Sequence, residues 1–245
     1  MRTRQVDSVL NLIKGSCFIG AGTTGFCFLL PNEKVVKIYY DSYRTRLLFS
    51  RYGSKLMDFF KYIGSFSDEN FYGPTEVLLK KNKIIGYVMD LSYGKTIRHM
   101  SGDVTIDDIE RMVDTLIKNV KEVSRRNLCI ADTHQKNIMY SYVFRMIDLD
   151  DCYYCRNYSY EKLVEYNMEN LLFVITKALF KVRDSNDVYF KNSKLDDLYK
   201  KSVYQNYEEY FEFLEYLRNY GKDLADLRLE GIHYSLKHED YYSKF

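Results

Sequence analysis

Three glycines at a fixed spacing, Gly20-x-Gly22-x-x-Gly25, are the feature that most limits the folds open to this chain. A dinucleotide-binding fold needs a helix directly after the last glycine, and a P-loop needs Gly-Lys-Ser/Thr there. Here Phe26–Leu30 is an apolar, strand-like run that stops at Pro31. Both folds are therefore excluded. The segment predicts two strands joined by a glycine turn, whose backbone can lie close to phosphates.

A lysine follows the glycine turn in the next strand-like run. Lys37 stands between Val36 and Ile38, and side-chain alternation along a strand places its ammonium on the face opposite these two residues. If that face lies under the glycine turn, Lys37 reaches the α- and β-phosphates of a nucleotide. Two more strands are predicted at Thr75–Lys80 and Ile84–Met89, which makes five in all.

Apolar residues spaced three and four apart predict helices elsewhere in the chain. The clearest stripe covers 106–123, and Thr105 with Asp108 resembles a capping box at its start. A helix over 42–63 is expected to be interrupted near Gly53. Two later helices are expected at Glu161–Phe180 and Tyr207–Leu217.

The period changes from strands to helices near Tyr93-Gly94. This change predicts a sheet-rich N-terminal domain over residues 1–91 and a larger helical domain over residues 92–245. The fold class expected from the residues is therefore α+β.

A second cluster of polar residues lies between short apolar runs. Asp132 and Asn137 are five residues apart on a predicted loop, and Asp148 follows eleven residues later at the end of an apolar strand. A carboxylate can take the proton of an acceptor hydroxyl, while an amide oxygen and a second carboxylate can hold Mg²⁺ against phosphates. These three residues are candidates for such chemistry.

In this order, the motifs resemble those of the protein-kinase-like phosphotransferase superfamily. Gly20-x-Gly22-x-x-Gly25 is similar to its glycine-rich loop, Lys37 to its third-strand lysine, and Asp132-x-x-x-x-Asn137 to its catalytic loop. Asp148-Leu-Asp150 stands where that family has a metal-binding Asp-Phe-Gly. The resemblance implies a two-lobe kinase-like fold, with a five-stranded antiparallel N-lobe, a helical C-lobe and ATP in the cleft between them.

The resemblance also implies a hinge at Tyr87–Ser92, where Asp90 and Ser92 offer a backbone carbonyl and N–H to adenine. Asn167 begins a segment that looks like the buried central helix of the kinase C-lobe. The family's lysine normally pairs with a helix Glu, but residues 34–68 contain none. Asp58, or Asp41 if the helix is placed differently, is the expected substitute.

Other departures narrow the kind of kinase. Ile130-Ala131 replaces the usual His-Arg, so control through a phosphorylated activation loop is not expected. The Asp148-Leu-Asp150 ending, with His134 two residues after Asp132, is more similar to aminoglycoside and choline kinases. His134 and Asp150 are therefore expected to support the site.

The expected activity is Mg²⁺-dependent transfer of the ATP γ-phosphoryl group to a hydroxyl acceptor, with Lys37, Asp132, Asn137 and Asp148 as catalytic residues and Asn137 and Asp148 as metal ligands. A protein Ser/Thr is slightly favoured as the acceptor, and a small molecule is the alternative. A pseudokinase, which binds nucleotide or a partner without turnover, is a second alternative. ATP and Mg²⁺ are the expected cofactors.

Charge and cysteine content bear on partners and location. The formal net charge is +2, from 36 Lys and Arg against 34 Asp and Glu, so the strong basic field of a dedicated nucleic-acid binder is missing. No apolar run approaches the roughly 20 residues that span a bilayer. Five scattered cysteines are typical of reduced thiols. We expect a cytoplasmic chain with no nucleic-acid or membrane partner.

Overall fold

The computed structural model describes residues 1–48, 55–66, 70–100, 104–182, 186–190, 192–219 and 231–235. These residues form two compact units. The first unit contains Met1–Tyr93 together with Arg145–Tyr153, and the second contains Gly94–Phe144 and the described residues from Tyr154 onward. The short segment Arg145–Tyr153, although distant in sequence, therefore packs with the N-terminal strands.

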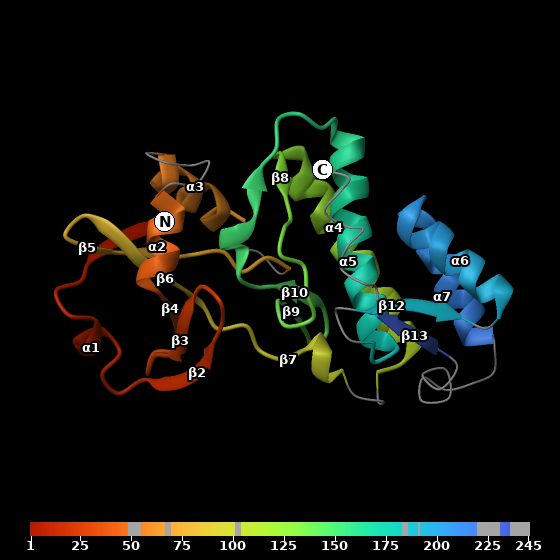
Figure 1. Ribbon diagram of the computed structural model, residues 1–245, viewed down its shortest axis with the longest axis horizontal. Coiled ribbons are helices and arrows are strands. Elements are labelled where there is room, and N and C mark those ends of the chain that lie inside the picture. Colours follow the sequence, from red (N-terminus) through yellow and green to blue (C-terminus); the bar gives the residue numbers. More distant parts are fainter. Residues whose placement is uncertain are drawn as a thin grey trace. The chain divides into compact units, whose positions relative to one another are not determined.

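The first unit is built on a six-stranded mixed sheet in the order β1-β5-β6-β4-β3-β2 (Figure 1). Its strands are β1 (Arg2–Gln5), β2 (Cys17–Ala21), β3 (Gly25–Leu29), β4 (Lys34–Tyr39), β5 (Glu76–Lys80) and β6 (Lys83–Asp90). The five predicted strands are all present and pair antiparallel. The expectation of five strands omitted β1, which pairs parallel to β5 at one edge and makes the sheet mixed.

Among the described residues, the short helical elements that accompany this sheet are α1 (Val9–Leu12), α2 (Asp41–Leu48), α3 (Leu56–Gly64) and η3 (Leu149–Asp151). The helix predicted over 42–63 is thus found as α2 and α3, and the expected break at Gly53 lies outside the described residues. α3 buries Leu56, Phe59, Phe60 and Ile63, which recur at three- and four-residue steps along one side of the helix.

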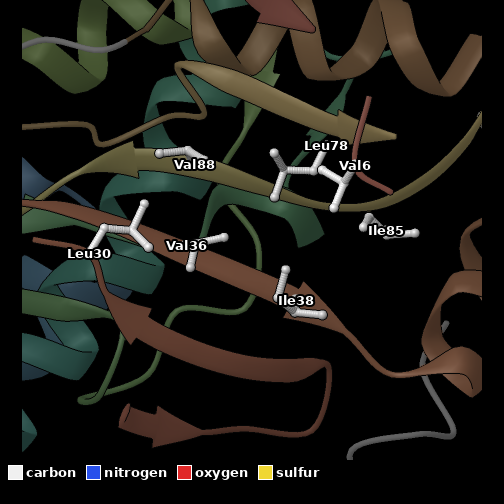
Figure 2. Packing of buried hydrophobic residues seen from close by; sticks show 7 residues of the cluster. All are labelled: Val6, Leu30, Val36, Ile38, Leu78, Ile85 and Val88. Carbon is white, nitrogen blue, oxygen red and sulfur yellow. The ribbon is translucent and has the colours of Figure 1, made fainter. Parts of the chain in front are cut away.

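The two faces of the sheet have different neighbours. On one face, apolar side chains from β4, β5 and β6 form a core with residues that flank β1 and β3, and Figure 2 shows seven of them. α1 covers this core with Val9 and Leu12. On the opposite face, Phe60 of α3 packs against the rings of Tyr39 and Tyr87. That second face carries Lys37.

The second unit is largely helical. It contains η2 (Ile97–His99), α4 (Ile106–Arg125), α5 (Tyr160–Leu179), α6 (Ser193–Tyr204), η4 (Tyr207–Glu209) and α7 (Tyr210–Asn219). Its short strands are β7 (Lys95–Thr96), β8 (Leu128–Cys129), β9 (Ile138–Tyr140), β12 (Asn186–Phe190) and β13 (Gly231–Ser235). β10 (Phe144–Met146) and β11 (Tyr153–Tyr154) stand where the chain passes from one unit to the other.

The long helix α4 begins where the sequence predicts. Thr105 accepts a hydrogen bond from the N–H of Asp108, and the Asp108 carboxylate accepts one from the N–H of Thr105, which together form a capping box. The apolar stripe of α4 is buried, and the helix packs against α5 and α7. None of the described helices combines the length and apolar character needed to cross a lipid bilayer.

Candidate functional site

A buried lysine on β4 is the centre of the site in the first unit. Lys37 lies directly opposite Cys27 on β3 and Tyr87 on β6, so these three side chains share one face of the sheet. Only 3% of Lys37 is exposed. An ammonium group buried this deeply needs negative charge and hydrogen-bond acceptors around it.

Two aspartates supply that charge. Nζ of Lys37 donates to one oxygen of Asp148 and, at 3.1 Å, to both oxygens of Asp150. The side chain of Asp150 is 1% exposed, whereas that of Asp148 is 31% exposed. The structure therefore brings together Lys37, Asp148 and Asp150, and Asp148 is the carboxylate open to solvent.

The group contains one ammonium and two carboxylates, so their formal charges do not cancel. Burial, together with repulsion from Asp150, raises the pKa of Asp148 well above its usual range. Burial would also raise the pKa of Asp150, but attraction to Lys37 and several hydrogen bonds outweigh it and lower the pKa to about 2. Burial would lower the pKa of Lys37, yet the attraction of Asp150 and Asp148 outweighs it and raises the pKa. Lys37 and Asp150 are thus the firmly ionised pair, and Asp148 loses its proton less readily than an ordinary aspartate.

Tyrosine hydroxyls complete the hydrogen bonding of these carboxylates. Tyr43 on α2 donates to Asp151 at 3.1 Å and to Asp150 at 3.4 Å, and Tyr87 donates to Asp148 at 3.2 Å. Burial raises the pKa of both tyrosines, so their hydroxyls stay protonated and act as donors. No local pattern in the sequence predicts these contacts.

Aromatic rings also line the lysine. Nζ of Lys37 lies 5.6 Å from the ring centroid of Tyr39 and 5.9 Å from that of Tyr87, within the range of a cation–π interaction. Tyr39 follows Lys37 by two residues on a strand, so alternation alone placed it on the same face. This signal was present in the sequence.

The helix carboxylate expected to pair with Lys37 does not do so. The side chain of Asp58 is 76% exposed and lies 4.0 Å from Lys61 on the same helix. Asp41 is 90% exposed and pairs with Arg44. The assignment of Asp58 as the lysine partner is therefore wrong, because α3 turns its apolar side toward the sheet and leaves Asp58 on the solvent side.

The three glycines lie in and beside the β2–β3 hairpin. Gly20 is on β2, Gly25 begins β3, and the N–H of Gly22 donates to the carbonyl of Gly25 at 3.0 Å to close the turn. A Cβ added at Gly20 or Gly22 would meet no described atom within 4 Å. The two glycines thus leave open space over the backbone, where an anion can approach N–H groups.

Gly25 has a packing role instead. A Cβ at this position would lie 2.1 Å from the carbonyl oxygen of Ile38 on β4. We expect Gly25→Ala to lower the free energy of unfolding by about 1–3 kcal/mol, because the two strands must move apart. The matched change Gly20→Ala should alter it by less than about 0.5 kcal/mol. Urea unfolding of the two variants measures the difference, and equal values would contradict this role.

The predicted hinge residues follow at the end of β6. The carboxylate of Asp90 accepts a hydrogen bond from Lys34, its neighbour on β4. Ser92 is 7% exposed, and its hydroxyl has no hydrogen-bond partner among the described residues. A buried hydroxyl without a partner is costly, and a ligand that supplies one would relieve that cost.

Another group of predicted residues belongs to the second unit. Nδ2 of Asn137 donates to a carboxylate oxygen of Asp132 at 2.9 Å and to its backbone carbonyl at 3.0 Å. Nε2 of His134 lies 3.6 Å from the same carboxylate, and the side chain of Asp132 is 42% exposed. Asp132 also has a positive φ of 54°, a conformation that Asp tolerates better than most residues. The loop thus presents an oriented, accessible carboxylate.

Asn167 on α5 holds the segment before this loop. Its Oδ1 accepts from the N–H of Ile130 at 2.8 Å, and its Nδ2 donates to the carbonyl of Leu128 at 2.9 Å and to the hydroxyl of Ser124 at 3.0 Å. Asn167 is fully buried. The sequence placed it in a buried helix but did not assign this role, although an Asn amid apolar helix residues was a signal.

We expect Asn167→Ala to lower the free energy of unfolding by about 2–5 kcal/mol, because it leaves the N–H of Ile130 and the carbonyl of Leu128 buried without partners. The control Glu165→Ala, at an exposed position of the same helix, should change it by less than about 0.5 kcal/mol. Chemical unfolding followed by circular dichroism tests this. A loss no larger than that of the control would show that water replaces the amide.

The side chains at Asp148 offer the type of ligand atom, carboxylate oxygen, that Mg²⁺ prefers. Mg²⁺ prefers oxygen ligands, and two carboxylates that share a single ammonium leave negative charge for a cation to neutralise. Within the described ranges, no three His, Cys, Asp or Glu side chains are grouped so as to hold a metal ion by themselves.

Comparison with known proteins does not assign the chain to a family. No protein-family model matches it, and no curated protein matches it either. Function must therefore be inferred from the side chains themselves, which form one group around Lys37 and another around Asp132.

Proposed function

We propose that this chain is an ATP- and Mg²⁺-dependent phosphotransferase that moves the γ-phosphoryl group to a hydroxyl acceptor. The observation that carries the proposal is the buried ion-paired group of Lys37, Asp148 and Asp150 on the sheet face next to the glycine hairpin. A lysine buried only for stability is more easily replaced by an apolar residue. A lysine fixed by carboxylates beside an open glycine turn suits a phosphate ligand.

The roles of the first unit follow from this geometry. Lys37 binds phosphate oxygens through its ammonium, which stays charged because Asp150 holds it. The backbone from Gly20 to Gly25 covers the phosphates, and Asp90 and Ser92 offer backbone groups to the base. Asp148, the more exposed carboxylate, would hold Mg²⁺, with the amide oxygen of Asn137 as the second predicted ligand. When bound, Mg²⁺ neutralises charge on the β- and γ-phosphate oxygens.

The second unit supplies the base. Asp132 accepts the proton of the acceptor hydroxyl on a carboxylate oxygen as that hydroxyl attacks the γ-phosphorus, the bond between the γ-phosphorus and the β–γ bridging oxygen breaks, and ADP leaves. Asn137 orients the carboxylate through its 2.9 Å hydrogen bond, and His134 faces the same oxygen. The accessible position of Asp132 favours this role over a structural one.

The identity of the hydroxyl acceptor, and the choice between a kinase and a pseudokinase, also belong to this proposal. We favour a protein Ser/Thr hydroxyl and keep a small-molecule hydroxyl as the alternative. The pseudokinase hypothesis drew its support from the missing helix carboxylate. The ion pair between Lys37 and Asp150 weakens that support, because it gives the lysine a carboxylate partner from elsewhere in the chain.

Two measurements on the full chain test the proposal. ATP with Mg²⁺ should raise the melting temperature, whereas Mg²⁺ alone should raise it much less, because the ion needs phosphate ligands. ATP consumption should then be measured, followed by a screen of protein and small-molecule hydroxyl acceptors with γ-labelled ATP. Stabilisation without turnover would indicate the pseudokinase, and no stabilisation by any nucleotide would refute the proposal.

A further inference from the structure

The two aspartates that contact Lys37 differ in ways that imply different roles. Asp150 offers both oxygens to the ammonium at 3.1 Å, is 1% exposed, and receives a further hydrogen bond from Tyr43. Asp148 offers a single oxygen to Lys37 and is 31% exposed. The geometry of Asp150 holds the lysine in place, whereas that of Asp148 leaves its carboxylate available to a ligand.

Among the described residues, no helix carboxylate competes for the holding role. Across the described part of the chain, Asp148 and Asp150 are the only acidic residues within 4.0 Å of the Lys37 ammonium. Asp58 and Asp41 face solvent and pair with basic neighbours on their own helices. The lysine anchor therefore comes from η3, not from α2 or α3.

We propose that Asp150 is the positioning residue of this site: it fixes Lys37 for phosphate binding, while Asp148 alone of the pair binds the metal ion. The proposal rests on the proposed phosphotransferase function. It contradicts the simpler interpretation that both carboxylates of an Asp-x-Asp motif are metal ligands. The distinction matters, because the two interpretations predict different behaviour of the same variant.

The positioning role predicts a specific pattern for Asp150→Asn. The amide keeps the shape of the side chain but lacks the charge that holds the ammonium. At saturating Mg²⁺, affinity for a non-hydrolysable ATP analogue should fall about tenfold, as for the loss of one charge-assisted hydrogen bond. The Mg²⁺ concentration at half-maximal nucleotide binding should change less than about twofold. Asp150→Glu should recover part of the affinity, and Asp58→Asn, the matched control, should match the wild type.

The ion pair between Lys37 and Asp150 can be tested by unfolding experiments without nucleotide. A double-mutant cycle of Lys37→Met and Asp150→Asn in urea unfolding should be non-additive by about tenfold in the unfolding equilibrium constant, because both residues belong to one ion pair. The double variant removes both charges of the buried pair and leaves only Asp148, which is 31% exposed, without the ammonium, so it should fold even if a single variant does not. In that case the failed single variant, restored by the second substitution, is itself the evidence of coupling.

The outcomes separate the two proposals. Coupling together with weaker nucleotide binding at unchanged Mg²⁺ dependence supports the positioning role. Additivity overturns it, and so does a shift in Mg²⁺ dependence as large as that of Asp148→Asn, which would make Asp150 a metal ligand. Coupling in a wild-type chain that binds no nucleotide would refute the phosphotransferase function and leave a purely structural ion pair, so the positioning role would fail with it.

Discussion

Asp148→Asn is expected to reduce turnover by at least about 10³-fold while leaving the fold intact. An amide cannot supply the negative charge that the proposed Mg²⁺ site needs, and the lost charge stabilisation in the transition state amounts to several kcal/mol. Stability should not fall with activity. Because the pKa of Asp148 is raised in the folded chain, its ionised form opposes folding at neutral pH, so the neutral amide should preserve or increase the free energy of unfolding.

The measurement pairs nucleotide binding across a Mg²⁺ series with thermal unfolding of the same samples. Asp58→Asn is the matched control, since that aspartate lies in the same unit, is 76% exposed and faces Lys61 on its own helix. Unchanged Mg²⁺ dependence in Asp148→Asn would remove Asp148 from the metal site. A marked loss of stability would show instead that Lys37 depends on Asp148 as its main partner.

Much of the fold could be predicted because its elements carry strong local patterns. Apolar, strand-like runs bounded by turn residues predicted the five strands β2 to β6, and helical periodicity with a capping box predicted α4. β1 gave no such signal, because its four residues are polar and exposed throughout. Backbone hydrogen bonds to β5 and the ion pair of Arg4 with Glu76 place β1 at the edge of the sheet. These contacts join residues far apart in the chain, so a local sequence pattern does not predict them.

The candidate site shows the same division between local and non-local information. Lys37 could be placed on the face opposite Val36 and Ile38 because strand alternation is local. Its carboxylate partner could not be chosen correctly from the sequence, because Asp150 follows it by 113 residues and the nearer Asp58 has the right chemistry within the predicted helix. Only the orientation of α3, which burial of its apolar side decides, excludes Asp58.

Asp132→Asn is expected to separate binding from chemistry. The amide is a poor proton acceptor, so turnover should fall roughly 10²–10⁴-fold, the range for loss of a positioned general base. ATP affinity should change less than about twofold, because Asp132 has no predicted contact with the nucleotide. The fold should survive, since Asn tolerates a φ of 54° as well as Asp does and can still accept from Nδ2 of Asn137.

Steady-state kinetics and direct nucleotide binding on the same preparation give the two quantities. His134→Gln is a useful companion, because it removes the imidazole that lies 3.6 Å from the carboxylate while leaving the proton acceptor in place. Its turnover should therefore fall much less than that of Asp132→Asn. If ATP affinity and turnover fell together in Asp132→Asn, the loop would be a binding element. If neither changed, the proton of the acceptor hydroxyl would be taken elsewhere, and the oriented carboxylate of Asp132 would have only a structural role.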